Sequence, residues 1–245
     1  MPQRKEQLVT GGICHIILRA IDNNLIFKNV DDYFRGIFCL YEFNNAKPVN
    51  ISIRRRDRFT EKKREKLIDI GSRTILTKDE RDQFVEILAF CFMPNHMHLL
   101  VKQVKDGGIS KFMQKTGIGL SKYLNRKYNR KGHVFQDAFK AVQMENDNQF
   151  MATASYIFTN PTALIEPGWK ELGIRNHSTE EVLKFLEGYK WSSYQDCIGI
   201  KNFPSVTQRD FLLEMMGGAE GLKNVIKDWI EHKKDIAKYK DLFLD

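Results

Sequence analysis

The sequence predicts an α+β protein: a ferredoxin-like antiparallel sheet with helices on one face, followed by a helical C-terminal extension. Up to about residue 160, segments with strand and helix patterns follow one another as strand, helix, strand, strand, helix, strand, helix. The first six of these match the ferredoxin-like order. From about residue 168 onward, the apolar residues recur at helical spacing. We therefore expect one domain over residues 1–167 and an extension over residues 168–245.

Four apolar segments predict the strands of the sheet. The first, over 12–20, is rich in β-branched residues and begins after a glycine. The apolar runs over 85–92 and 96–102 flank a short segment that contains Pro94, which predicts a turn between neighbouring strands. The fourth strand is expected over 139–144.

Helices are predicted where apolar residues recur every three or four positions. In the first of them, over 31–43, Asp31 or Asp32 is a suitable cap. Asp147 is expected to cap a helix that ends at Asn160, because the residue before Pro161 disfavours the helical region. The other helices are expected over 110–128, 179–189, 208–216 and 218–239.

The segment over 50–78 is polar and highly charged, and we interpret it as an insertion into the first domain. Near its end, Thr77 and Glu80 have the spacing of a capping box. Eight basic residues stand between Arg54 and Lys66, which predicts either a solvated surface or a contact with a polyanion.

The formal net charge of +8 over 245 residues makes nucleic acid the leading candidate for a partner. Between Lys111 and Lys140, eight basic residues accompany one acidic residue and several aromatic residues. Cations that pair with phosphates and rings that stack on bases are what single-stranded nucleic acid requires. From these two basic stretches we expect DNA contacts at Arg54, Arg55, Arg56, Lys115, Lys122, Arg126, Lys127, Arg130, Lys131 and His133.

The sequence contains no apolar run long enough for a membrane span, and its first residues lack the apolar core of a signal peptide. The four cysteines are scattered, without a CxxC pair, as is usual in a reducing compartment. We therefore expect a cytoplasmic protein that does not associate with membranes.

The segment from Phe92 to Val101, FMPNHMHLLV, contains the strongest chemical signal in the chain. Side chains alternate between the faces of a strand, so His96 and His98 project to the same side while Met97 points to the other. Two neutral imidazoles on one face can bind one divalent metal ion. The alternative is a pair of surface histidines.

A second signal lies on the helix that ends before Pro161. Tyr156 and Asn160 are four residues apart and therefore neighbours on one helical face. Tyrosine can act as a covalent nucleophile, and an amide oxygen is a suitable ligand for a hard cation. A core tyrosine followed by a helix stop is the simpler interpretation of the same two residues.

The ordered motifs FMPNHMHLLV, GHVFQDAFKA, ASYIFTNP and KWSSY together resemble the single-tyrosine HUH transposases, and within them the REP-associated tyrosine transposases. The resemblance extends over about residues 12–200. It implies that His96, His98 and Asn160 bind Mg²⁺ or Mn²⁺ and that Tyr156 is the nucleophile. It also implies that residues 1–167 form the catalytic domain, acting on single-stranded or hairpin DNA through a 5′-phosphotyrosine intermediate. Dimers and monomers both occur among such enzymes, so a homodimer remains possible.

Two other functions fit the same sequence: a domesticated protein that binds hairpin DNA without cutting it, and a metal-dependent phosphodiesterase in which water attacks. Tyr123 and Tyr128 are rival nucleophiles on the basic helix. His15 on the first strand is expected to be structural, or to support the metal ligands from behind.

Overall fold

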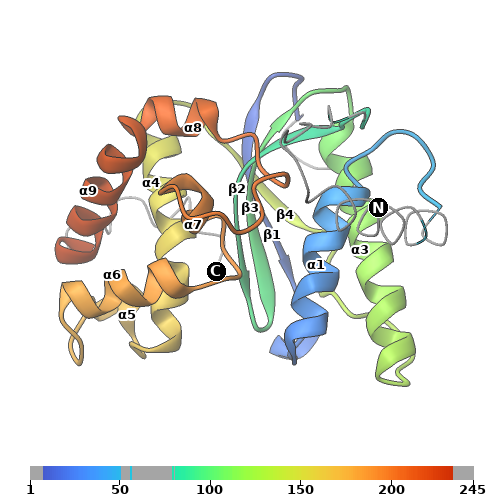
Figure 1. Ribbon diagram of the computed structural model, residues 1–245. Helices are drawn as coiled ribbons and strands as arrows, with labels where there is room; N and C mark the ends of the chain where they lie inside the picture. Colours follow the sequence, from blue (N-terminus) through green and yellow to red (C-terminus); the bar gives the residue numbers. More distant parts are fainter. Residues whose placement is uncertain (1–7, 51–55, 57–78, 80, 234–245) are drawn as a thin grey trace, which may run out of the picture.

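Figure 1 shows the computed structural model of the protein, which describes residues 8–50, 56, 79 and 81–233. Arg54, Arg55, Thr77 and most of the charged insertion lie outside these residues. The described elements are, in order, β1 (Ile13–Arg19), η1 (Ile21–Asn23), α1 (Val30–Glu42), β2 (Val85–Met93), β3 (His96–Gln103), α3 (Gly108–Lys127), β4 (Lys140–Gln143), α4 (Asp147–Thr159), η2 (Asn160–Leu164), α5 (Trp169–Leu172), α6 (Thr179–Gly188), α7 (Tyr194–Cys197), α8 (Asp210–Met215) and α9 (Gly218–Glu231).

Within the described residues, four strands form one sheet in the order β2-β3-β1-β4, and all neighbouring strands are antiparallel. The predicted α+β class and ferredoxin-like order of elements are confirmed. In the β1–β3 pair, Ile17 lies opposite His98 and His15 lies opposite Leu100. This register places His15 diagonally beside His98, on the same face of the sheet.

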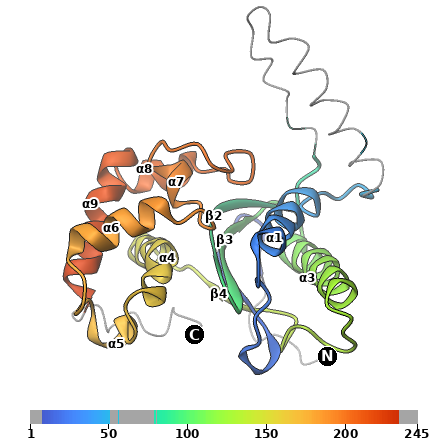
Figure 2. The same cartoon turned by 60° about the horizontal axis from the view of Figure 1, so that its bottom comes forward.

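The first face of the sheet packs against α1 and α3, which lie side by side in both views (Figures 1 and 2). Its core contains Ile16, Leu18, Phe90 and Leu99 together with apolar residues of the two helices. The helices approach closely at Gly119 of α3, where an added Cβ would overlap the ring of Phe43. The sheet with α1 and α3 on its first face is the ferredoxin-like arrangement that the sequence predicts.

The prediction of helices on one face is confirmed for α1 and α3, and a second layer, formed by α4 and the C-terminal helices, covers the other face (Figure 1). Strand β2 contributes Leu88, Ala89, Cys91 and Met93 to this second core, where α4 and Trp169 also pack. The physical reason lies in β2, which is apolar on both faces. A strand of that kind must be buried on both sides.

The C-terminal helices are joined to the sheet at the outer edge of β2. Ser193 donates its backbone N–H to Phe90 O (3.0 Å), and Phe92 donates its own to Trp191 O (2.8 Å). These bonds satisfy backbone groups that an edge strand would otherwise leave unpaired. The KWSSY segment therefore anchors the C-terminal helices to the sheet.

Two predicted helix caps were wrong by one or two residues. Asn29 caps α1 and forms a capping box with Asp32, and Asn146 caps α4 through Gln149 N. A cap residue must be extended while its side chain reaches the third residue of the helix. Asp32 and Asp147 already lie within the helices, where they complement the positive end of the helix dipole.

No helix in the part of the chain that the structure describes is both long enough and apolar enough to cross a bilayer.

Two glycines of α3 provide a test of the α1–α3 contact. Alanine at Gly119 must displace the ring of Phe43, and we expect a loss of about 1–3 kcal/mol in the free energy of unfolding. Alanine at Gly117 meets open space, and it should stabilise the helix by about 0.5–1 kcal/mol. Urea unfolding of both variants measures the difference. Equal effects of the two substitutions would contradict the close packing.

Candidate active site

The two histidines of β3 project into the second core, as the alternation of the strand predicts. Their neighbours Met97, Leu99 and Val101 lie in the first core. The rings of His96 and His98 are 4.7 Å apart between centroids and nearly perpendicular, with an interplanar angle of 84°. Both histidines are buried, so the reading as a surface pair is excluded.

His98 is held between two other buried side chains. Its Nδ1 lies 3.0 Å from His15 Nε2 on β1, and its Nε2 lies 3.2 Å from Asn160 Nδ2 at the end of α4. His15, His98 and Asn160 are each at most 1% exposed. His15 therefore contacts the candidate metal ligand directly, as the supporting role predicted from the sequence requires.

Burial strongly lowers the pKa of His98, and the neighbouring His15, Lys170 and Arg19 lower it further. The ring is therefore neutral at pH 7 and retains a lone pair. His96 Nδ1 lies 2.6 Å from Asn95 Oδ1, and an N–H donated there places the lone pair of His96 on Nε2. His98 thus has the protonation state that a metal ligand needs.

The amide of Asn160 is the third candidate metal ligand. Its Oδ1 is buried and has no hydrogen-bond partner among the described residues, although buried carbonyl oxygens are nearly always bonded. Rotation of the amide would turn Oδ1 toward His98 Nε2. Among the described residues no group of three or more His, Cys, Asp or Glu side chains forms a metal cluster. The donors that this cluster could offer are two imidazoles and one amide oxygen, a set that fits Mg²⁺ or Mn²⁺.

Tyr156 lies against this cluster from α4, one helical turn before Asn160. Its ring is perpendicular to that of His98, with centroids 5.5 Å apart, and edge-on to His15 at 6.0 Å. The side chain is 3% exposed. Tyr156 and Asn160 are neighbours, as predicted, and both contact His98 of β3.

Two lysines of the C-terminal part, neither of which was predicted, also reach Tyr156. Lys170 Nζ lies 3.3 Å from Tyr156 Oη, and Lys233 Nζ lies 6.0 Å from the centroid of the same ring. Burial lowers the pKa of Lys170 to about 8, with a further contribution from Arg19. A single lysine in a four-residue helix has no motif, so only the folded arrangement identifies it.

The rival nucleophiles lie on the other side of the sheet. Tyr123 and Tyr128 both donate their hydroxyl groups to the buried carboxylate of Asp32, over 3.1 Å and 2.5 Å. Burial raises the pKa of both phenols, and the charge of Asp32 raises it further. Hydroxyl groups that donate to a carboxylate in the α1–α3 layer are far from the imidazoles and poorly suited to attack.

Two of the predicted DNA contacts have partners inside the protein. Lys127 Nζ lies 2.7 Å from Asp32 Oδ1 and 2.8 Å from Asn29 Oδ1. Lys115 Nζ donates to Asn45 O and lies over the ring of Phe84. These two lysines join α3 to the rest of the first face, which does not favour the predicted role in DNA binding.

The other basic residues of this region are exposed or half-buried. Lys122 and Arg126 are exposed on α3, Lys131 and His133 are exposed in the loop that follows, and Arg130 is half-buried. Arg56 is also exposed. These side chains remain predicted DNA contacts.

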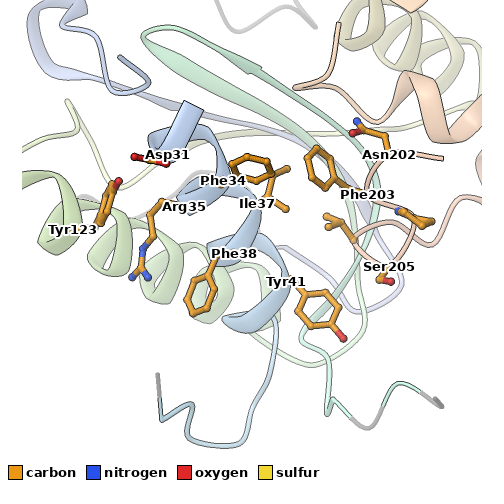
Figure 3. A pocket seen from close by; sticks show the side chains of 12 residues that line it. Asp31, Phe34, Arg35, Ile37, Phe38, Tyr41, Tyr123, Asn202, Phe203 and Ser205 are labelled. Atoms are coloured by element: carbon orange, nitrogen blue, oxygen red, sulfur yellow. The ribbon is translucent and has the colours of Figure 1, made fainter. Parts of the chain in front are cut away.

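A cavity of about 700 Å³ lies beside α1, away from the imidazoles (Figure 3). None of the predicted metal ligands lines it, and neither does Tyr156. Its walls come from α1, α3 and the loop before α8, and five of the twelve residues are aromatic: Asp31, Phe34, Arg35, Ile37, Phe38, Tyr41, Tyr123, Asn202, Phe203, Pro204, Ser205 and Val206.

Comparison with known proteins agrees with the sequence motifs. Residues 44–160 match the family model described as "Transposase IS200 like", a segment that contains the candidate residues of β3 and α4. This match confirms the resemblance to the single-tyrosine transposases over that segment. One solved structure, a REP-associated tyrosine transposase bound to a REP hairpin, is 12% identical, with 83% of this chain and 90% of that chain covered and a TM-score of 0.47. No curated protein matches the chain.

The contact between His15 and His98 predicts how metal binding responds to mutation. Replacing His15 with Phe removes the partner of His98 Nδ1 while keeping a ring of similar size. We expect the affinity for Mn²⁺ to fall about 10–100-fold, because the orientation of the ligand is no longer fixed. Calorimetric titration with Mn²⁺ measures the effect, and His133→Ala, in an exposed loop, is the control. Unchanged affinity in the His15 variant would show that His98 does not bind the metal.

Proposed function

We propose that this protein, whose residues 44–160 match the IS200-like transposases, nicks and rejoins single-stranded DNA through a phosphotyrosine at Tyr156. The family match is to transposases, enzymes that bind, cut and join DNA. The assignment of Tyr156 rests on one observation: its phenol packs on the buried His98–His15–Asn160 cluster and hydrogen bonds with Lys170. The phenol of Tyr156 therefore lies beside the candidate metal ligands, which supports its assignment as the nucleophile.

In the proposed reaction, Tyr156 Oη attacks the phosphorus of a DNA phosphodiester. The Oη–P bond forms and the bond from phosphorus to the 3′-oxygen breaks, which leaves a 5′-phosphotyrosine and, after proton uptake, a 3′-hydroxyl group. The covalent bond retains the phosphoester linkage, so attack by a 3′-hydroxyl group reverses the step and joins strands without a nucleotide cofactor. Because Tyr156 is buried, neighbouring groups must move for the phosphate to reach Oη.

The side chains of the cluster have separate tasks in this proposal. His96, His98 and Asn160 would hold Mg²⁺ or Mn²⁺, which when bound supplies Lewis-acid stabilisation of charge on the phosphoryl oxygens. His15 keeps His98 in one orientation and one tautomer. The apolar surroundings of the second core limit the access of water to the reacting atoms.

The partner that we propose is single-stranded or hairpin DNA. The accessible basic residues of α3 and the following loop offer charges for the phosphates, and the net charge of +8 favours a polyanion. The loop also leads back to the site, since Gln136 N donates to Arg19 O at the end of β1. A cytoplasmic location belongs to the same proposal, and all four cysteines remain buried thiols.

Tyr156→Phe tests the nucleophile, because the change removes only the attacking oxygen. We expect the covalent protein–DNA adduct to disappear while hairpin affinity changes by less than about threefold, since the surface that binds phosphates is untouched. A denaturing gel with labelled hairpin DNA from the flanks of the gene, with Mn²⁺ or EDTA, measures the adduct.

Tyr123→Phe and Tyr128→Phe are the matched controls, and both should retain the adduct. An adduct that persists in Tyr156→Phe and is lost in a control would move the nucleophile to the first face. Cleavage without any adduct would instead indicate that water attacks, and binding without cleavage would indicate a DNA-binding protein without nicking activity.

A further inference from the structure

We propose that Lys170 is the general base of this site: its amine takes the proton from Tyr156 Oη in cleavage and returns it in rejoining. This inference rests on the proposed function, because it assigns the proton of the same nucleophile. It also gives the C-terminal helices a catalytic role, since Lys170 lies outside the segment that matches the transposase family.

The position of Lys170 is set by buried residues that hold the short helix α5 in place. Its neighbour Trp169 is 1% exposed in the second core, so the short helix α5 is fixed in place. The turn before it is held by Glu166, a fully buried carboxylate. Glu166 accepts hydrogen bonds from Asn176 N (2.8 Å) and His177 Nδ1 (2.7 Å), which ties both sides of α5 together. Lys170 Nζ is thereby held 3.3 Å from Tyr156 Oη, within reach of its proton.

The surroundings of Lys170 shift the balance between ammonium and neutral amine toward the amine, compared with a lysine in water. Several titratable or charged groups act on it, from β1, β2, α4, α5 and the residues after α9: Arg19, Cys91, Tyr156, Glu171 and Lys233. Burial has the largest effect, and the two cations Arg19 and Lys233 add to it, while Glu171 opposes it. The resulting pKa of about 8 lies near neutral pH, where a general base is most effective.

The proton balance of the step follows from this placement. As the Oη–P bond forms, the phenol proton moves to the neutral amine of Lys170, and the 3′-oxygen that departs takes a proton from solvent water. The new ammonium group lies beside the anionic phosphotyrosine and stabilises it. In rejoining, the attacking 3′-hydroxyl group releases its proton to solvent water, and the ammonium returns its proton to Oη as the phosphotyrosine bond breaks.

The alternative is that Lys170 acts only through its positive charge. Replacing Lys170 with arginine distinguishes this role from that of a general base. Arginine retains the positive charge but does not deprotonate in proteins. Single-turnover rates of adduct formation should be measured between pH 6 and 10 for the wild type, Lys170→Met, Lys170→Arg and the exposed control Lys184→Met. Hairpin affinity and melting temperature of each variant establish that it is folded.

We expect the wild-type rate to rise with pH and to level off above about pH 8, because the base acts only when neutral. Both Lys170 variants should be slower by about 10²–10⁴-fold and should lose this rise, while Lys184→Met keeps the wild-type profile. An arginine variant with a rate close to that of the wild type would overturn the proposal in favour of a charge effect.

Carbon-13 NMR of the lysine Cε groups gives a test that does not depend on activity. The Lys170 resonance, assigned by its absence in Lys170→Met, should titrate near pH 8, well below the surface lysines. Titration together with the surface lysines would overturn the proposal. A wild type that forms no adduct would remove the proposed function and this inference together, whereas full activity of Lys170→Met would remove the inference alone.

Discussion

Burial of strand β2 on both faces is the constraint on which the rest of this structure depends. Although β2 lies at the edge of the sheet, it has apolar side chains on each side, so a single layer of helices would leave half of them in water. Helices α1 and α3 cover the first face, and α4 with the C-terminal helices covers the second. This second layer also brings Tyr156, Asn160 and Lys170 to the histidines of β3.

The polar cluster of the second face is possible only because its members satisfy one another. An isolated polar side chain in an apolar core costs free energy, and this cost falls when hydrogen bonds replace those to water. His15, His98 and Asn160 form such a chain within the wall of the core, with Asn160 Oδ1 as the atom that has no partner among the described residues. A cluster held in this way orients its nitrogen and oxygen atoms before any ligand binds, which is what a metal site requires.

Local patterns predicted the residues whose relation depends on one element alone. His96 and His98 share a face because a strand alternates, and Tyr156 and Asn160 meet because a helix repeats after four residues. The prediction missed relations between elements: the second helical layer and the lysines near Tyr156. The apolar run of β2 is the sequence signal for the second helical layer. Lys170 had no signal, since its contact arises from α5 packing through Trp169. The pairing of Lys127 with Asp32 could not be predicted, because the two residues are distant in sequence.

In the proposed site, the second face of the sheet binds a metal ion beside a nucleophilic tyrosine. Anomalous diffraction from crystals grown with Mn²⁺ would locate the ion without any assumption about the reaction. We expect one strong peak bonded to His96, His98 and Asn160, with the amide oxygen of Asn160 turned toward the ion. A peak at other side chains, or an empty cluster at a Mn²⁺ concentration that supports cleavage, would show that the proposed site is wrong.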